Sequence, residues 1–403
     1  MSANSVTASI KVPFNKPVVL DRQEALLAEA IRNGHLSGNG PFTKRCEQLL
    51  EKIAGKKTLL VSSGTHALEM IPLLLDLKPG DEVILPSYTF SSTANAFALR
   101  GAVLRFADND LFGNILPSEV ERLLSKKTKA VMAVHYAGAS ADLDAISEIC
   151  AKNSVPLVED AAQAIGASYK GRTLGTIGEL GCYSFHETKN VTSGEGGALI
   201  LGNSKFLDRA EILREKGTNR ARFFQGLADK YTWVDIGSSY LMSDMNAAYL
   251  YPQLDDLPQI TKRRKQIWEG YKTSLAAEFA EFDIRVLGTP AHNTPNYHLF
   301  AMIMPNHELR TRFISFMKSN GIICPFHYVS LHTSPFGARF YSGRPEHLPG
   351  CEKLSQSLVR FPLFYNLTEE EQGYVIEKAR KWLLEEKIKP RGTGKGHGDE
   401  PAY

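Results

Sequence analysis

The sequence predicts an α/β protein with a mostly parallel sheet that helices cover on both faces, followed by a smaller α+β part. Three observations support this fold class. Short apolar runs alternate with stretches of helical spacing from about residue 58 to residue 160. The strand-like runs are apolar almost throughout, as is typical of strands buried on both faces. Beyond residue 180 the regular alternation ends, and strands and longer helices follow in a less regular order.

Each element of the N-terminal half has its own signal. Residues 1–16 are polar and unpatterned and are predicted to form an arm, and helices are expected at 26–31 and 42–54. The alternating segments then follow as strand 58–62, helix 66–77, strand 82–85, helix 93–99, strand 103–106, helix 116–124, strand 130–134, helix 143–151 and strand 156–158.

The second half predicts a further group of elements and a domain boundary. Its expected elements are strands 182–185 and 197–201, helix 205–216, one long helix 243–267, strand 298–304, helix 309–319, strand 322–327 and helix 369–385. We therefore expect a large domain over 17–255 and a small C-terminal domain over 256–386. The tail 387–403 has no apolar periodicity and is expected to be disordered.

Composition and charge exclude several classes of protein. The 403 residues contain 47 Lys+Arg and 44 Asp+Glu, a net charge of +3, whereas a dedicated nucleic-acid binder would carry a strong basic excess. Five scattered cysteines argue against a disulfide framework or a cysteine zinc site. No apolar run approaches the roughly 18 residues of a membrane span, and the N-terminus lacks a signal-peptide core. A cytoplasmic enzyme without membrane or nucleic-acid partners is expected.

Residues 62–67, Ser-Ser-Gly-Thr-His-Ala, are a candidate phosphate loop between a strand and a helix. A helix N-terminus offers free N–H groups and the positive end of the dipole. Gly64 permits close approach and Thr65 adds a hydroxyl. The alternative is an ordinary Ser/Thr helix cap. The glycine-rich string 392–398 follows no strand and opens no helix, so a tag or linker is its favoured interpretation.

Two further segments carry groups that complete a cofactor site. The strand ending at 158 is followed by Glu159 and Asp160, and an Asp at that end of a strand can reach a ligand in the crevice, although a solvated turn is the alternative. Lys189 lies between a strand and a glycine-rich turn, and a lysine can form a Schiff base with an aldehyde cofactor. A phosphate loop, an Asp and a Lys follow one another in the chain in this order. Together they indicate a binding site for pyridoxal 5'-phosphate. No metal is expected, because His186-Glu187 begins like H-E-x-x-H but position 190 is Asn.

From about residue 13 to residue 386 the chain resembles the DegT/StrS-type nucleotide-sugar aminotransferases, which belong to the fold type I pyridoxal-phosphate enzymes. The motifs that carry the resemblance occur in one order: SSGTHAL (62–68), PGDEVILPSYTFSSTANA (79–96), VHYAG (134–138), VEDAAQA (158–164), GCYSFHETKN (181–190), SGEGG (193–197), REKGTN (214–219), MSDMNAA (242–248), YHLF (297–300) and SLVRFPLFYNLTEEE (357–371).

The resemblance implies a role for several residues. Lys189 would form the Schiff base, and Asp160 would pair with the pyridine nitrogen of the cofactor. The other cofactor contacts implied are Gly64, Thr65 and Ser184 on the phosphate, Phe90 stacked on the ring and Gln163 near the ring hydroxyl. It also implies a homodimer with shared active sites and L-glutamate as the amino donor to a nucleotide-sugar substrate.

The sequence departs from the family pattern at two positions. Ser239 replaces an Asn that many relatives extend to the phosphate of the neighbouring subunit. Ile165 replaces a His that lies near the sugar in many members. The candidates for substrate contacts are therefore His186, Ser239, His327 and His332, and a packed or surface role is the alternative for each His.

Within the family, the motifs SFHETKN and REKGTNR are most similar to those of the enzymes that aminate dTDP-4-keto-6-deoxyglucose. A 3-keto-sugar or a UDP-keto-sugar as substrate stays open. Related sugar 3-dehydratases carry His in place of the Schiff-base lysine, so Lys189 disfavours that reaction. The intact Asp160, Lys189 and Ser184 disfavour a regulatory paralogue without activity.

Overall fold

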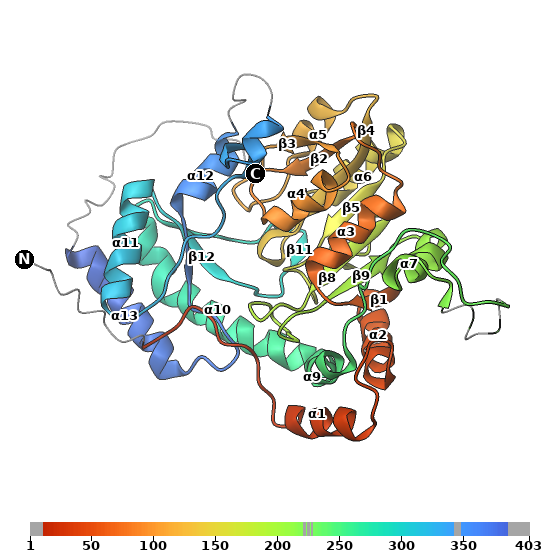
Figure 1. Ribbon diagram of the computed structural model, residues 1–403. Coiled ribbons are helices and arrows are strands. Elements are labelled where there is room, and N and C mark those ends of the chain that lie inside the picture. Colours follow the sequence, from red (N-terminus) through yellow and green to blue (C-terminus); the bar gives the residue numbers. More distant parts are fainter. Residues whose placement is uncertain (1–10, 221–222, 224–225, 227–228, 342–347, 386–403) are drawn as a thin grey trace, which may run out of the picture.

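The protein is described here by a computed structural model that covers residues 11–220, 223, 226, 229–341 and 348–385. Its centre is a seven-stranded sheet with the strand order β1-β9-β8-β5-β4-β2-β3 (Figure 1). Pairing is parallel from β8 to β3, whereas β9 is antiparallel to both β8 and β1. The strands are β1 (Lys57–Val61), β2 (Glu82–Pro86), β3 (Val103–Ala107), β4 (Thr128–Val134), β5 (Leu157–Asp160), β8 (Leu180–Ser184) and β9 (Gly197–Leu201). The predicted mostly parallel sheet is confirmed.

Helices cover both faces of this sheet. Alternate residues of a strand point to opposite faces, so Leu60 packs into one apolar cluster and its neighbours Leu59 and Val61 into another. The first cluster includes side chains of α1 (Gln23–Arg32), α2 (Pro41–Ala54), α5 (Pro117–Leu123), α6 (Leu143–Lys152) and α9 (Asp244–Asp255). The second includes side chains of α3 (Gly64–Leu74), α4 (Ser91–Ala98), α7 (Leu207–Arg214) and α12 (Pro349–Ser357).

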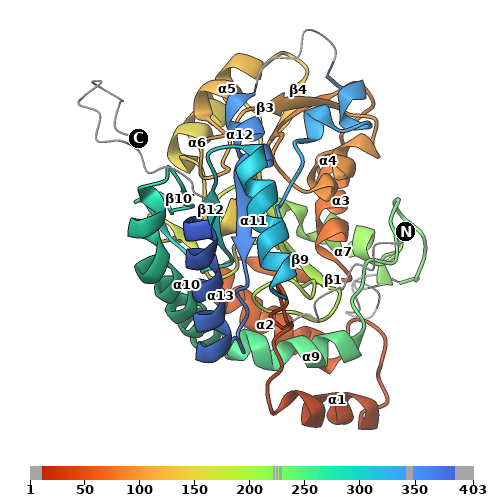
Figure 2. The same ribbon diagram turned by 90° about the vertical axis from the view of Figure 1, so that its left-hand side faces the viewer.

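A second layer, here called the C-terminal layer, packs around a third apolar cluster. It consists of the antiparallel sheet β10 (Arg285–Val286), β12 (Phe300–Ile303) and β13 (Leu358–Phe361) with helices α10 (Leu257–Ala280), α11 (His307–Ser319) and α13 (Glu369–Glu385), and Figure 2 shows these helices together. A small sheet of β11 (Asn293–Thr294), β6 (Ser168–Tyr169) and β7 (Arg172–Thr173) joins the two parts of the chain.

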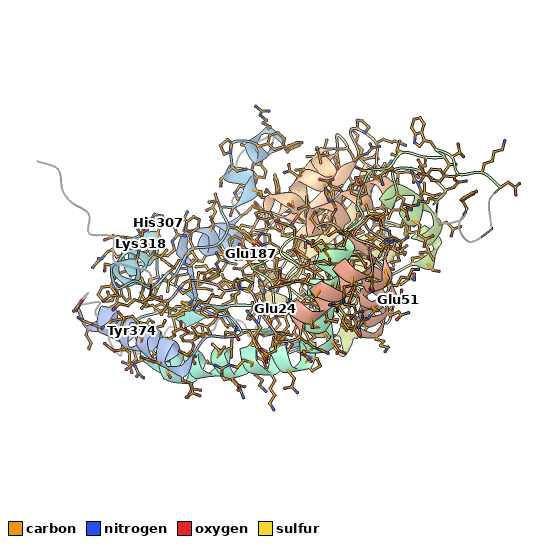
Figure 3. The ribbon with its side chains drawn as sticks, turned by 60° about the horizontal axis from the view of Figure 1, so that its bottom comes forward. Glu24, Glu51, Glu187, His307, Lys318 and Tyr374 are labelled. Carbon is orange, nitrogen blue, oxygen red and sulfur yellow. The ribbon has the colours of Figure 1, made fainter. Side chains whose placement is uncertain are left out.

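The loop after β8 lies between the seven-stranded sheet and the C-terminal layer. In Figure 3, Glu51 of α2 and His307 of α11 lie toward opposite ends of the molecule, and Glu187 of this loop lies between them. The main chain of the arm crosses here as well, because Asn15 donates a hydrogen bond to the carbonyl of Glu187 (3.1 Å). The arm also bridges to the C-terminal layer through Val12, which pairs with Ile322.

Two of the predicted elements were wrong, and several elements were not predicted, namely the strands β6, β7, β10, β11 and β13 and the helix α12. The single helix predicted over 243–267 is two helices, α9 and α10, because Pro258 starts a new helix in a first turn that needs no N–H donor. The strand predicted over 322–327 is only an isolated bridge at Ile322, since Pro325 has no N–H to donate to a ladder. The layer instead uses β13, which the sequence analysis did not predict as a strand.

The remaining predictions of organisation are tested only in part. The predicted boundary at 255/256 falls between α9 and α10, and the division into two domains stays a prediction. The predicted tail 387–403 lies outside the described residues, as do residues 1–10 of the predicted arm. None of the described helices is long and apolar enough to cross a bilayer. All five cysteines are buried free thiols.

Candidate active site

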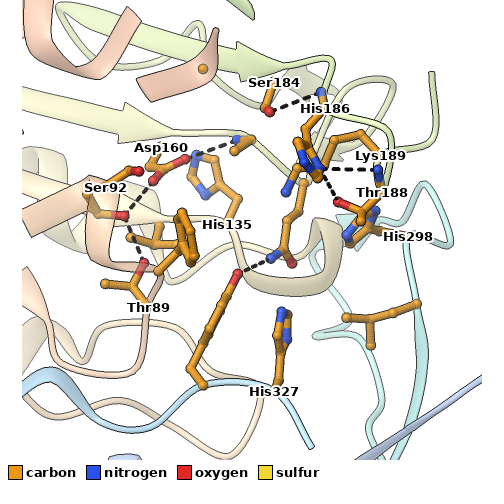
Figure 4. A pocket seen from close by; sticks show the side chains of 18 of the residues that line it. Thr89, Ser92, His135, Asp160, Ser184, His186, Thr188, Lys189, His298 and His327 are labelled. Carbon is orange, nitrogen blue, oxygen red and sulfur yellow. Dashed lines mark hydrogen bonds between the residues drawn. The ribbon is translucent and has the colours of Figure 1, made fainter. Parts of the chain in front are cut away.

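The carboxyl ends of β1, β2, β4, β5 and β8 meet at one edge of the sheet, and a cavity of about 500 Å³ lies there. Nine of the predicted site residues line this cavity: Gly64, Thr65, Phe90, Asp160, Gln163, Ser184, His186, Lys189 and His327. Figure 4 shows Asp160, Ser184 and Lys189 around the cavity, with His327 on the side of the C-terminal layer. We call Gly64, Thr65, Asp160, Ser184 and Lys189 the strand-end wall.

The phosphate-loop candidate is the N-terminus of α3. Ser63 caps the helix by accepting a hydrogen bond from the backbone N–H of His66 (3.0 Å). A Cβ at Gly64 would fall 2.8 Å from the Cβ of Ser184, so only glycine lets β8 approach the helix this closely. The hydroxyls of Thr65 and Ser92 lie 2.8 Å apart. The helix cap uses one N–H and leaves Gly64 and Thr65 open to the cavity. The segment can therefore cap the helix and bind a phosphate at the same time.

Asp160 is the last residue of β5 and is 5% exposed. Its carboxylate accepts hydrogen bonds from the Thr93 hydroxyl (2.7 Å) and the Ala162 N–H (3.1 Å). Thr93 in turn bonds to the hydroxyl of Thr89 (2.9 Å), so a chain of hydroxyls orients the carboxylate from the start of α4. The neutral donors fix the group in place without neutralising its charge.

Glu159 points to the opposite face of the sheet, as strand alternation requires. It is fully buried and accepts hydrogen bonds from His135 Nε2 (2.8 Å) and from the backbone N–H groups of Gly175, Ile177 and Gly178. Burial raises its pKa, but these hydrogen bonds outweigh that effect, and the pKa lies below its ordinary value. Of the two adjacent carboxylates, only Asp160 therefore serves the cavity.

Lys189 belongs to the turn after β8, where its backbone N–H bonds to the carbonyl of His186 (2.9 Å). Burial lowers the pKa of its amine, and the nearby charge of Asp160 opposes the shift without cancelling it. A lysine with a lowered pKa has more of the neutral, nucleophilic amine at physiological pH. The loop is anchored by Asn190, which donates to the carbonyl of Asn296 (2.9 Å).

The opposite side of the cavity comes from the C-terminal part of the chain. We call His298, His327, Tyr328 and Arg360 the C-terminal wall. The ring of His327 stacks on that of Tyr328 with centroids 3.7 Å apart, and its Nδ1 lies 2.7 Å from the hydroxyl of Tyr136. Burial and the positive charge of Arg360 hold the pKa of His327 well below its ordinary value. His327 is therefore a neutral side chain at physiological pH.

Gln163 connects the two walls. Its amide oxygen accepts a hydrogen bond from the Ala137 N–H (2.8 Å), and its amide nitrogen donates to the Tyr328 hydroxyl (2.8 Å). Phe90 lies beside the same tyrosine, with ring centroids 6.2 Å apart, and 58% of its surface is exposed. Its exposed ring leaves room for a flat partner.

Two predicted residues lie away from the cavity. His332 is buried, and its Nδ1 lies 2.6 Å from the hydroxyl of Ser87. The alternative of a packed histidine therefore describes it better than a substrate contact. Ser239 pairs with Glu215 in an isolated bridge, and its contact with a neighbouring subunit stays a prediction. Ile165, the second departure from the family pattern, is buried in the core.

Several lining residues were missed by the sequence analysis. His298 and Arg360 occurred in the quoted motifs YHLF and SLVRF, but no role was assigned to them. Tyr328, Thr93 and Phe14 also line the cavity. A polar or charged residue inside an otherwise apolar strand, such as Arg360 between Val359 and Phe361, was the signal that could have identified one of them.

The cavity suits pyridoxal phosphate. Gly64 keeps the helix N-terminus accessible to a phosphate. Asp160 presents a buried carboxylate that a protonated ring nitrogen can meet, and the uncharged fraction of Lys189 can react with an aldehyde. The described residues contain no group of three or more His, Cys, Asp or Glu that could hold a metal ion.

Comparison with known proteins agrees with this chemistry. Residues 19–380 match the model of the DegT/DnrJ/EryC1/StrS aminotransferase family. An uncharacterised protein of Methanocaldococcus jannaschii, MJ1066, is 31% identical over 355 residues, 86% of this chain and 91% of that protein. The aminotransferase TlmJ from Streptoalloteichus hindustanus is 31% identical, with a TM-score of 0.85 over 93% of this chain and 99% of the other.

The PLP-form of Spr1654 from Streptococcus pneumoniae is 26% identical, with a TM-score of 0.84 over 94% of this chain and 99% of the other. The predicted fold type, the aminotransferase activity and the cofactor pyridoxal phosphate are thereby confirmed. The chain belongs to the DegT/DnrJ/EryC1/StrS aminotransferase family.

Proposed function

We propose that this aminotransferase moves an amino group from L-glutamate to a nucleotide-linked keto-deoxysugar, dTDP-4-keto-6-deoxyglucose. The proposal rests above all on one observation: Lys189, Asp160 and the N-terminus of α3 line the same cavity. The sequence motifs support the sugar substrate, and a sugar aminotransferase activity has been suggested for Spr1654. The reaction would run in two half-reactions, with the cofactor leaving the first as pyridoxamine phosphate.

When bound, pyridoxal phosphate supplies an electron-withdrawing ring that stabilises negative charge on the carbon next to the amine. Asp160 would keep the ring nitrogen protonated through a charge-assisted hydrogen bond. The N–H groups at Gly64 and the hydroxyls of Thr65 and Ser184 would hold the phosphate. These residues therefore fix the cofactor at both ends.

Lys189 moves the proton. Its lowered pKa would let the amine take up the proton of the donor carbon and give it back, as general base and then general acid. A tethered amine also replaces a bimolecular proton transfer by an intramolecular one, which can be worth several kcal/mol. Residue 189 is Lys and not the His that the related sugar dehydratases carry, which favours amino transfer over dehydration.

A homodimer with shared active sites is part of the proposal. A group of apolar side chains near Ser239 is exposed in the single chain: Tyr231, Trp233, Val234 and Ile236, of which Trp233 is 75% exposed. Such exposure is unusual for a monomer and fits burial against a second copy. A cytoplasmic location belongs to the same proposal.

Product analysis tests the substrate assignment. The purified enzyme with L-glutamate is incubated separately with dTDP-4-keto-6-deoxyglucose, its 3-keto isomer and the UDP analogues, and the products are identified by NMR. We expect a dTDP-4-amino-4,6-dideoxy sugar from the first, with the galacto configuration, and slower turnover of the others. Equal or faster turnover of a 3-keto or UDP substrate would contradict the assignment.

A further inference from the structure

Arg360 is the cavity residue whose chemistry the proposed function leaves unused. It lies on β13, where it pairs with Ala301 of β12. Its neighbours Val359 and Phe361 both belong to the core of the C-terminal layer. Alternation along the strand therefore turns Arg360 to the opposite face, toward the cavity.

The guanidinium is held in place but not neutralised. It stacks over the ring of Phe14, 4.3 Å from its centroid, and Nη2 donates to the carbonyl of Phe326 (2.9 Å). Its Nε is buried without a hydrogen-bond partner, and no carboxylate of the described chain forms an ion pair with it. Two other arginines have partners of a different kind: Arg214 pairs with Glu47, and Arg264 donates to three carbonyls.

The charge of Arg360 reaches the reacting end of the cavity. Burial is the main cause of the lowered pKa of Lys189, His298 and His327, and the charge of Arg360 adds to the lowering in all three. Among the described residues that line the cavity, Arg360 and Lys189 are the cations. A half-buried guanidinium without an ion-pair partner, which lines the same cavity as two neutral imidazoles, is a strong site for an anion, and its planar fork matches a carboxylate.

We infer that Arg360 binds the α-carboxylate of the amino donor, an inference that rests on the proposed function. In an α-amino acid the carboxylate is bonded to the carbon that gives its proton to Lys189, so it must lie close to that amine. In a nucleotide-linked 4-keto sugar the diphosphate lies on the far side of the ring from the ketone. A cation near Lys189 therefore suits the donor carboxylate better than the diphosphate.

Binding of two keto acids to the pyridoxal-phosphate form tests the inference without turnover. The probes are 2-oxoglutarate and 4-oxopentanoate, which has a methyl group in place of the α-carboxylate. A hydrogen bond to a charged group corresponds to roughly a 10- to 100-fold preference for the first in calorimetric titrations of the wild type. In Arg360→Gln this preference should fall to nearly one, and in Arg360→Lys it should be intermediate.

Arg310→Gln is the matched control. Arg310 also belongs to the C-terminal layer, stacks over Phe326 and has a buried Nε without a partner, but it does not line the cavity. Its loss should leave the preference for 2-oxoglutarate unchanged. A preference that survives in Arg360→Gln, or that falls equally in Arg310→Gln, would overturn the inference.

The half-reactions distinguish the two anions. Arg360→Gln should slow the reaction of the pyridoxal form with L-glutamate about 10- to 100-fold and change the reaction of the pyridoxamine form with the keto sugar less than about threefold. The reverse pattern would assign Arg360 to the diphosphate. If the wild type binds 2-oxoglutarate through Arg360 but aminates no keto sugar, the proposed substrate is wrong and the role of Arg360 stands.

Discussion

The two walls of the cavity differ in how far their polar groups are satisfied. On the strand-end wall, Asp160 accepts hydrogen bonds from Thr93 and from the main chain, and Gly64 packs directly against Ser184. On the C-terminal wall, two histidines are kept neutral and Arg360 has a buried Nε without a partner. The carboxylate of the first wall is therefore already hydrogen-bonded, whereas the cation of the second wall has a buried N–H without a partner.

This difference reflects what each wall must hold. The ends of parallel strands are fixed by the sheet, so the strand-end wall can hold a cofactor in one orientation. The C-terminal wall draws His327 and Tyr328 from a segment without regular structure, beside a strand of another sheet. Changes on the first wall should therefore affect both half-reactions, and changes on the second should affect one substrate or the stability of the fold.

The largest effect is expected for Lys189→Ala. Loss of the amine removes both the covalent link to the cofactor and the group that moves the proton, so both half-reactions should slow by roughly 10⁴-fold or more. Stopped-flow absorbance of the cofactor with L-glutamate, and then with the keto sugar, measures each step. Lys205→Ala, a surface lysine paired with Glu179, should retain wild-type rates. A Lys189→Ala enzyme that still turned over would remove this residue from the mechanism.

A smaller loss is expected for Asp160→Asn. Thr93 and Ala162 donate to different oxygens of Asp160, so the single amide oxygen of Asn can keep only one of these two hydrogen bonds. The amide also cannot stabilise a proton on the ring nitrogen, so both half-reactions should slow by roughly 100-fold. Steady-state kcat for both substrates, together with the affinity for pyridoxal phosphate, provides the measurement.

Glu159→Gln is the control for this substitution, because it changes the neighbouring carboxylate on the opposite face of the sheet. It should lower the midpoint of thermal unfolding, since Glu159 accepts four buried hydrogen bonds, and leave kcat of the folded enzyme within severalfold of the wild type. If the two variants lost activity equally, the assignment of Asp160 alone to the cofactor would be wrong.

The same contrast explains which parts of the molecule could be predicted from the sequence. The strand-end wall comes from segments where a strand signal and a polar residue are adjacent in the chain, as at Asp160, so local pattern was sufficient. The C-terminal wall depends on contacts such as Arg360 with Phe14, 346 positions earlier in the chain, and no local pattern encodes such a contact. The break before Pro258 was missed because the helical apolar spacing continues on both sides of it.

The smallest expected effect is on the pH dependence of stability and concerns His298. This imidazole bonds through Nδ1 to the side-chain oxygen of Asn190 (2.8 Å), and burial with the charges of Lys189, Arg264 and Arg360 holds its pKa well below 6.5. Below that pH His298 binds a proton in the unfolded chain but not in the folded protein. The free energy of unfolding should therefore fall as the pH drops. His298→Gln should reduce this slope by about 1 kcal/mol per pH unit below pH 6, because one pKa unit corresponds to about 1.4 kcal/mol.

Chemical unfolding between pH 5 and 8, at one protein concentration, measures the slope, and His307→Gln provides the control. His307 lies exposed at the start of α11, so its removal should leave the slope unchanged. His327 is also kept neutral, so His298→Gln should remove only part of the dependence and the double variant with His327→Gln more of it. An unchanged slope in His298→Gln would mean that the C-terminal wall accepts a proton in the folded state, and the contrast between the two walls would then be smaller than the structure indicates.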